Sequence, residues 1–317
     1  MMMKKTFTFA LVCLPVCAFG QASTPTSAAS ASQLSSPNEP PMLGIHWAKG
    51  FEPSYRVLEE GKQNESGSHG SRTSKSPLMT NHGGKIMTVA NTQAIFWGPS
   101  WTTSPGDKIT GMDSWYQGFG NSTYAAASNE YTGNNGQVTS GSTYAGHVVD
   151  GSASSGGGST SVILAEVCKT ISNPDTSGNG YYPVYSDTPR GSANYCAYHS
   201  AGTCGGVPLQ FAFFFNADGD AGCNPNDTSG LHSEGLAAIA NTSGHELSEA
   251  RTDPASPGAW YDGSGQENGD KCNFVFPTPL VTFSNGSQWK VQGEWSNQAY
   301  SAGTGYPNSS GQKGCIE

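Results

Sequence analysis

Cysteine content is the feature that most restricts how this chain of 317 residues can fold. Six of the eight cysteines lie in its second half: Cys168, Cys196, Cys204, Cys223, Cys272 and Cys315. In an exported chain, an even number of cysteines indicates three disulfides. The spacing leaves their pairing open, and the absence of a Cys-x-x-Cys pair argues against a cysteine-bound zinc. We therefore expect a disulfide-stabilised domain.

The N-terminus predicts export. Lys4 and Lys5 precede a short apolar run that ends in the small residues Ala18 and Gly20, a pattern typical of a signal peptide cleaved after Gly20. The apolar run is too short for a stable membrane anchor, and no later stretch could span a bilayer. We therefore expect a secreted or periplasmic protein without a membrane span.

The low charge narrows the range of partners. Only 12% of the residues are charged, and loss of Lys4 and Lys5 with the signal would change the formal net charge from −9 to −11. A nucleic-acid-binding protein would be expected to carry a basic stripe, so we expect no nucleic-acid partner. The sequence does not indicate an oligomeric state.

Three segments follow from the composition. Residues 1–20 are the expected signal peptide, and residues 21–80, rich in Ser, Gly, Pro and Lys, are expected to be a disordered linker or a propeptide. A propeptide that blocked a metal could use His46 or His69. Residues 81–317 are expected to form one domain.

Apolar patterns place the main elements of that domain. Strands are expected within 85–98 and at 207–215, where "VPLQFAFFF" is apolar on both faces and therefore central. Helices are expected at 106–120, near Tyr124, at 159–171 and at 233–252, followed by short strands and turns. Because no βαβ rhythm is visible, the predicted class is α+β with a mixed sheet and an active-site helix.

The stretch "SGHELSEARTDP" carries the chemistry. His245 and Glu246 begin like a zinc-protease helix, but Glu249 stands where the second histidine would be expected. His245 and Glu249 lie one turn apart, where they could offer two metal ligands, and Glu246 would be the base that activates water. The apolar stripe of this helix faces the other way and comprises Leu236, Ile239, Ala240, Ser243, Leu247 and Ala250. A solvated helix face is the alternative interpretation.

The carboxylate ligand also affects the choice of metal. Glu249 would make the metal a weaker Lewis acid than a second imidazole would, and oxygen ligands shift the preference from zinc towards manganese or calcium. Zinc is the expected cofactor, with calcium as the alternative.

Several motifs resemble the EXORDIUM-like, or phosphate-induced protein, family. They are the His-Glu-Leu-x-Glu helix at 245–249, Thr-Asp-Pro at 252–254, Ala-Trp-Tyr at 259–261, the acidic segment 267–272 ending in Cys272, His-Gly-Gly at 82–84 and "YCAYHS" at 195–200. Ala197 stands where that family usually has glycine. The resemblance implies an exported, disulfide-bonded protein with a zincin-like helix, and it leaves the reaction open.

A third ligand is expected after the helix. We favour Asp270, because Cys272 would anchor its position and the family pattern keeps that acid, and Glu267 is the next candidate. Asp253 precedes Pro254 and is expected to cap the helix end. Asp262 lies in the same turn-rich segment, where Asp side chains often bond their own backbone.

Other polar positions are weaker candidates. His82 and His199 could take part in a site, whereas His147 is expected to be an ordinary strand residue. The segment 216–227, "NADGDAGCNPND", spaces its oxygens like a calcium loop, but Ala221 occupies the position that an EF-hand reserves for glycine.

The predicted function is an exported, peptidase-like metal-dependent hydrolase with His245, Glu249 and Asp270 as ligands. Its partner would be a peptide or cell-wall substrate. One alternative is a carboxylate glycoside hydrolase that uses Glu246 with Glu249 or Asp270, with Trp260 and Tyr261 stacking on sugar. The other is a non-catalytic cell-wall or surface protein.

Overall fold

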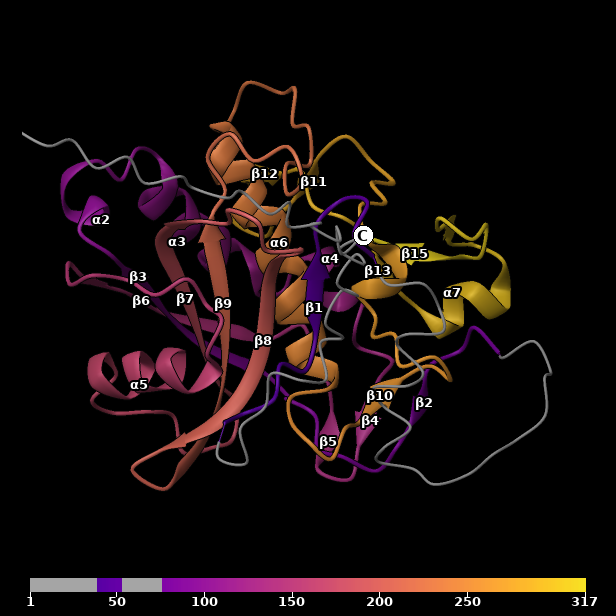
Figure 1. Ribbon diagram of the computed structural model, residues 1–317. Helices are drawn as coiled ribbons and strands as arrows, with labels where there is room; N and C mark the ends of the chain where they lie inside the picture. Colours follow the sequence, from indigo (N-terminus) through magenta and orange to yellow (C-terminus); the bar gives the residue numbers. More distant parts are fainter. Residues whose placement is uncertain (1–38, 53–75) are drawn as a thin grey trace, which may run out of the picture.

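The computed structural model describes residues 39–52 and 76–317. Its centre is a six-stranded mixed sheet in the order β1-β8-β9-β7-β3-β6 (Figure 1). In that order the strands are Ile45–Trp47, Tyr195–Cys204, Val207–Asn216, Gly180–Pro189, Ala90–Trp97 and Ser142–Asp150. Strands β9, β7, β3 and β6 are parallel, whereas β8 runs antiparallel to β9 and β1 antiparallel to β8. The mixed sheet was predicted.

Strand β9 is an inner strand, as its apolar sequence predicted. Side chains alternate along a strand, so Phe211, Phe213 and Phe215 face one side of the sheet, and Ala212 and Phe214 face the other. Both sets are buried because helices cover both faces.

The helices form one layer on each face (Figure 1). Helix α5 (Thr160–Thr170) packs Ile163 and Val167 into the core on the Phe213 side. Helices α3 (Lys108–Phe119) and α6 (Glu234–Thr252) share the core on the opposite side. Three shorter helices are α2 (Ser100–Thr103), α4 (Thr123–Ala126) and α7 (Asn297–Ala302). The helices predicted at 106–120, near Tyr124, at 159–171 and at 233–252 are confirmed.

The expectation that the chain lacks a βαβ rhythm is wrong. Strand β3 is followed by α2, α3 and α4 before the parallel strand β6, and α5 separates β6 from β7, which is parallel to β3. The hairpin of β4 (Thr132–Gly133) and β5 (Gly136–Gln137) interrupts the first connection and hides the alternation in the sequence. The class is therefore mixed α/β.

The chain after α6 forms a further layer of short strands. They are β10 (Trp260–Tyr261), paired with β2 (Thr80–Asn81), and β11 (Val281–Thr282), β12 (Gln288–Trp289), β13 (Glu294–Trp295), β14 (Tyr306–Pro307) and β15 (Lys313–Ile316). With the sheet on its other side, α6 is buried all round from Gly235 to Thr252. The predicted stripe is buried, but the opposite side of the helix is buried as well.

Three cysteine pairs lie at disulfide distance. Cys168 pairs with Cys204, Cys196 with Cys223, and Cys272 with Cys315. The first joins α5 to β8, the second joins β8 to the loop after β9, and the third joins a short 3-10 turn, η2 (Asp270–Cys272), to β15. These pairs agree with the predicted disulfide framework.

The segment 39–52 is part of the domain. A disordered linker was one expectation for residues 21–80, and it does not hold for Ile45–Trp47, because these residues form strand β1 on the open edge of β8. The alternative that they belong to a propeptide is not affected. The predicted signal peptide, residues 21–38 and residues 53–75 with His69 lie outside the described part of the chain.

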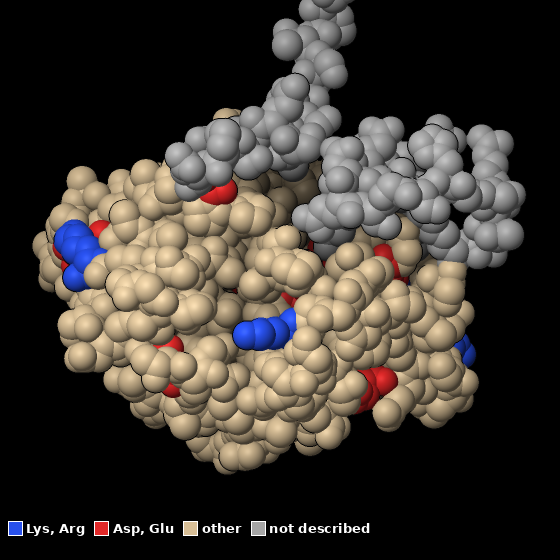
Figure 2. All heavy atoms as spheres, turned by 90° about the horizontal axis from the view of Figure 1, so that it is seen from below, with Lys and Arg blue, Asp and Glu red and all other residues tan. Residues whose placement is uncertain are grey.

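The surface carries few charges. On the face shown in Figure 2, Lys, Arg, Asp and Glu side chains are scattered singly over a surface that is otherwise uncharged. Among the described residues, no helix is long and apolar enough to cross a membrane.

Candidate metal centre

Helix α6 holds two of the predicted ligands in fixed positions. Its N-terminus is capped by Ser233, whose hydroxyl accepts a hydrogen bond from the Leu236 backbone at 3.2 Å. Helical geometry then brings His245 and Glu249 together, one turn apart, with 3.0 Å between Nε2 and Oε1. Neither side chain is exposed to solvent, so the interpretation as a solvated helix face is wrong.

Strand β8 brings a second histidine to the same place. Tyr198 faces the α5 side of the sheet, so its neighbour His199 faces α6. His199 is fully buried, with Nε2 3.8 Å from Oε2 of Glu249 and 3.4 Å from Oε2 of Glu267. The "YCAYHS" motif is the only sequence signal for this residue, and it indicates a place in a site without a role in binding the metal.

The loop after β10 brings in Asp270. Its Oδ1 lies 4.0 Å from Nε2 of His245, and its backbone N–H donates to Oε1 of Glu249 at 3.0 Å. The preceding Gly269 lies so close that a Cβ there would stand 2.9 Å from the His245 ring. Cys272, two residues beyond Asp270, ties this turn to β15, so the turn is anchored as the sequence predicted.

These side chains form two overlapping groups. The first is His245, Glu249 and Asp270, and the second is His199, Glu246 and Glu249. Within each group, one potential ligand atom from every residue lies within 4.8 Å of the others. A buried group of histidine, glutamate and aspartate therefore exists that could hold a metal ion.

Gln292 orients the His245 ring, and sequence reasoning missed it. Its side-chain nitrogen lies 3.1 Å from Nδ1 of His245 and donates to the Gly269 carbonyl at 2.8 Å. This contact engages one ring nitrogen and leaves Nε2 facing Glu249 and Asp270. Nε2 lies 3.0 Å from Oε1 of Glu249 but makes no hydrogen bond of suitable geometry in residues 39–52 and 76–317. A buried polar atom without a well-formed hydrogen bond is costly, which favours a ligand at this point.

Glu246 lies beside the ligands and is also fully buried. Its Oε1 accepts a hydrogen bond from the backbone N–H of His46 at 3.1 Å, and its Oε2 has no hydrogen-bond partner within the described ranges. Its position next to a potential ligand set agrees with the expected role of a base.

Burial sets the protonation of the cluster. It raises the pKa of Glu246 and of Asp270 well above their ordinary values, and the nearby Glu249 carboxylate raises both further. Burial also lowers the pKa of His245 to about 4, so its imidazole is neutral and keeps a lone pair for a ligand bond.

The other predicted acids lie outside the two groups. Asp253 is the C-cap residue of α6, as expected, and its side chain accepts a hydrogen bond from the Ala259 backbone at 2.5 Å. Asp262 accepts bonds from Ser264 and pairs with Lys271 at 2.5 Å. Glu267 stands beside His199 and belongs to neither group.

The remaining predicted histidines lie away from the cluster. His82 stacks on Tyr261, with ring centroids 3.6 Å apart. His147, on strand β6 as expected, contacts Asp113 at 2.9 Å.

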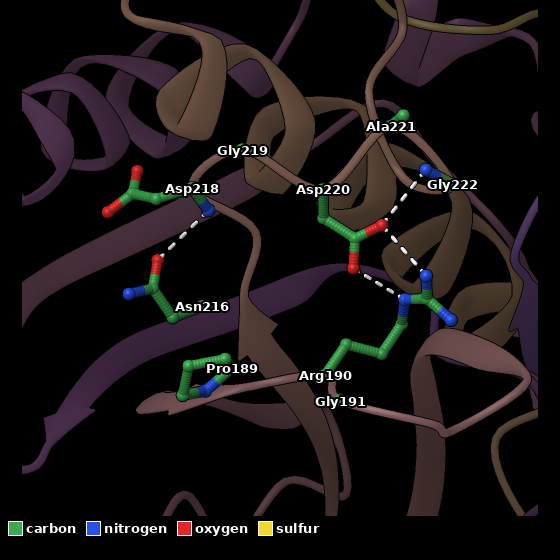
Figure 3. A pocket seen from close by; sticks show the side chains of 9 residues that line it. All are labelled: Pro189, Arg190, Gly191, Asn216, Asp218, Gly219, Asp220, Ala221 and Gly222. Atoms are coloured by element: carbon green, nitrogen blue, oxygen red, sulfur yellow. Dashed lines mark hydrogen bonds and ion pairs between the residues drawn. The ribbon is translucent and has the colours of Figure 1, made fainter.

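The calcium-like loop is neutralised by basic side chains. Figure 3 shows Arg190 bound to both oxygens of Asp220, beside a shallow hollow of about 310 Å³. Lys108 pairs with Asp218 at 2.7 Å, and His232 contacts Asp227 at 3.2 Å. These contacts favour a polar turn over a calcium loop for this segment.

Comparison with known proteins gives no family assignment. No family model matches the chain, and neither the curated proteins nor the solved structures contain a match. The interpretation of the site therefore rests on its geometry.

Proposed function

We propose that this chain is an exported metal-dependent hydrolase that cleaves peptide bonds. The observation that supports the proposal best is the convergence of the buried His245 and Glu249 with the largely buried Asp270. Glu246 adds a carboxylate that is available as a base beside them. Zinc is the ion proposed, because zinc accepts mixed nitrogen and oxygen ligands in hydrolases.

Each side chain has a distinct role in this proposal. His245, Glu249 and Asp270 hold the ion, which when bound would polarise the scissile carbonyl and acidify water. Glu246 takes the proton from the attacking water and passes it to the leaving amine. Gln292 keeps the His245 ring turned towards the ligands.

A glycoside hydrolase has less support. Trp260 and Tyr261, which were expected to stack on sugar, pack instead on Tyr131 and His82. A pair of catalytic carboxylates would also not require His245.

A zincin-like fold, membership of the EXORDIUM-like family and export remain parts of the proposal. The motifs at 245–249 and 267–272 support the family resemblance, and the three cysteine pairs support an oxidising compartment. A non-catalytic wall protein with a structural metal is the rival, and it predicts metal binding without turnover.

Elemental analysis of the purified protein tests the proposal. We expect about one zinc per chain, with loss in both His245→Ala and Glu249→Ala. The matched control is Asp218→Ala, which removes an acid from the neutralised loop and should leave the metal content unchanged. A wild-type protein without stoichiometric metal would refute the proposal, and metal without hydrolysis of any peptide would favour the structural rival.

A further inference from the structure

The edge of β8 carries an added strand that crosses the candidate site. Strand β1 pairs antiparallel with β8, with His46 opposite Ala197. The pairing extends beyond β1, because Leu43 donates to the His199 carbonyl at 3.0 Å and Ala48 donates to the Asn194 carbonyl at 3.0 Å. Residues 43–48 thus supply backbone partners along the open edge of the sheet (Figure 1).

This strand lies directly on the groups proposed for catalysis. The His46 backbone donates to the Glu246 carboxylate at 3.1 Å, and the His46 ring stands 4.5 Å from the His245 ring, centroid to centroid. At Gly44 the contact is closer still, since a Cβ there would lie 2.0 Å from Oε2 of Glu249 and 2.5 Å from the His199 ring. Backbone from 44 to 46 therefore occupies the space beside the ligands and the base.

The His46 side chain also indicates that a ligand could bind in this space. It is fully buried; the Gln292 side chain lies within reach of the ring, but neither ring nitrogen makes a hydrogen bond of suitable geometry in the described part of the chain. A buried histidine that binds no ligand would be expected to have hydrogen-bond partners for its ring nitrogens. His46 also belongs to neither potential ligand group, so it stands over the site without completing it.

We propose that the edge of β8 is the binding site for an extended peptide substrate, and that residues 43–48 occupy this site until they are displaced. The inference rests on the proposed function, because a hydrolase must place the backbone of its substrate beside Glu246 and the ligands. Strand addition recognises the main chain of a peptide, so it tolerates many sequences. The close contact at Gly44 adds one restriction, a small residue at that position.

The experiment uses the full chain with a specific-protease sequence inserted after Asn64 and cut once the protein has folded. A fluorescein-labelled peptide with the sequence of residues 42–52 is the probe. We expect the fragment that carries residues 1–64 to dissociate on dilution, and the labelled peptide to bind the remaining chain saturably. Unlabelled extended peptides should compete with it.

Two altered probes test the position of the strand. A peptide with Gly44→Val should bind about tenfold or more weakly, because the added side chain meets Glu249 and His199. A peptide with Phe51→Ala is the matched control and should bind within about twofold of the parent, because Phe51 is 51% exposed. Equal binding of the Gly44→Val peptide, or a fragment that never exchanges with the probe, would overturn the inference.

Metal content, measured on the same cut samples, separates the two proposals. Zinc without peptide binding would refute the inference about β8 and leave the proposed metal site standing. Peptide binding without zinc would refute the hydrolase and leave the binding edge. Displacement of the probe by a wall oligosaccharide, but not by unfolded peptides, would overturn the assignment of peptide as the ligand.

Discussion

Two acidic loops of this molecule look alike in sequence and differ in structure. Residues 216–227 and 262–272 each contain several acids among Gly and Asn. In the first, Lys108 and Arg190 form ion pairs with Asp218 and Asp220. In the second, Lys271 pairs with Asp262, whereas the largely buried Asp270 has no Lys or Arg ion pair within the described residues, and its nearest basic partner is the neutral His245. The comparison teaches that the charge around an acid, more than its spacing, distinguishes a potential metal ligand from a polar turn.

The largest expected effect separates the base from the ligands. Glu246→Gln keeps the shape of the side chain but removes its capacity to take a proton. We expect peptide hydrolysis to fall by about 10²–10⁴ while zinc remains bound. Steady-state kinetics with a peptide substrate and elemental analysis of the same sample would measure both. Loss of the metal together with activity would instead make Glu246 a ligand, as the group that it forms with His199 and Glu249 allows.

The next effect concerns the third ligand. Asp270→Asn should lower zinc affinity by about 10–100-fold, because it weakens one donor of the group that contains His245. Glu267→Gln is the comparison variant and should cause a smaller loss, since Glu267 contacts His199 and lies in neither group. Competition with a zinc chelator measures both affinities. A larger loss for Glu267→Gln would transfer the ligand role to that residue.

Sequence reasoning located the ligands better than their surroundings. The helical spacing of His245 and Glu249 is a local property, and the strand and helix patterns are local too, so both could be predicted. The burial of α6 on all sides could not, because its cover comes from residues far along the chain, such as Gln292. His46 reaches the site through the pairing of β1 with β8, and His199 through the pairing of β8 with β9, which short-range patterns do not encode. The parallel strands were missed for the same reason.

A third prediction concerns the loop 216–227, whose acids are neutralised by basic side chains. Asp220→Asn removes the charge that Arg190 binds with 2.5 and 2.9 Å contacts. Burial raises the pKa of Asp220, but the hydrogen bonds and charge of Arg190, together with the backbone N–H groups of Gly222 and Cys223, outweigh it and leave that pKa below its ordinary value. We expect a loss of about 1 kcal/mol in the free energy of unfolding, measured in urea, and no change in zinc content. Wild-type protein should gain no thermal stability from added calcium, and a clear gain would break the comparison between the loops.

The smallest effect comes from an acid that is only partly neutralised, and so is intermediate between Asp220 and Asp270. Glu166, on α5, is buried and shares Lys169 with Asp150, but the lysine itself is half exposed. Burial, and after it the hydrogen bond with Asp150, raises the pKa of Glu166 to about 7 from an ordinary value of 4.5. Between these two pH values the folded protein holds a proton that the unfolded chain has released. Stability therefore falls as pH rises through this window.

Replacing that acid should remove its share of the pH dependence. The pKa of Asp150 is lowered, so its contribution is lost only as pH falls below its ordinary value of 3.8, outside the window. Urea unfolding at pH 5 and pH 7.5 should show wild type losing on the order of 1 kcal/mol more than Glu166→Gln, after allowance for screening at the exposed lysine. An identical loss in both proteins would mean that Lys169 neutralises Glu166 as fully as Arg190 neutralises Asp220. A single half-exposed lysine would then neutralise a buried acid as well as Arg190 does in the loop 216–227.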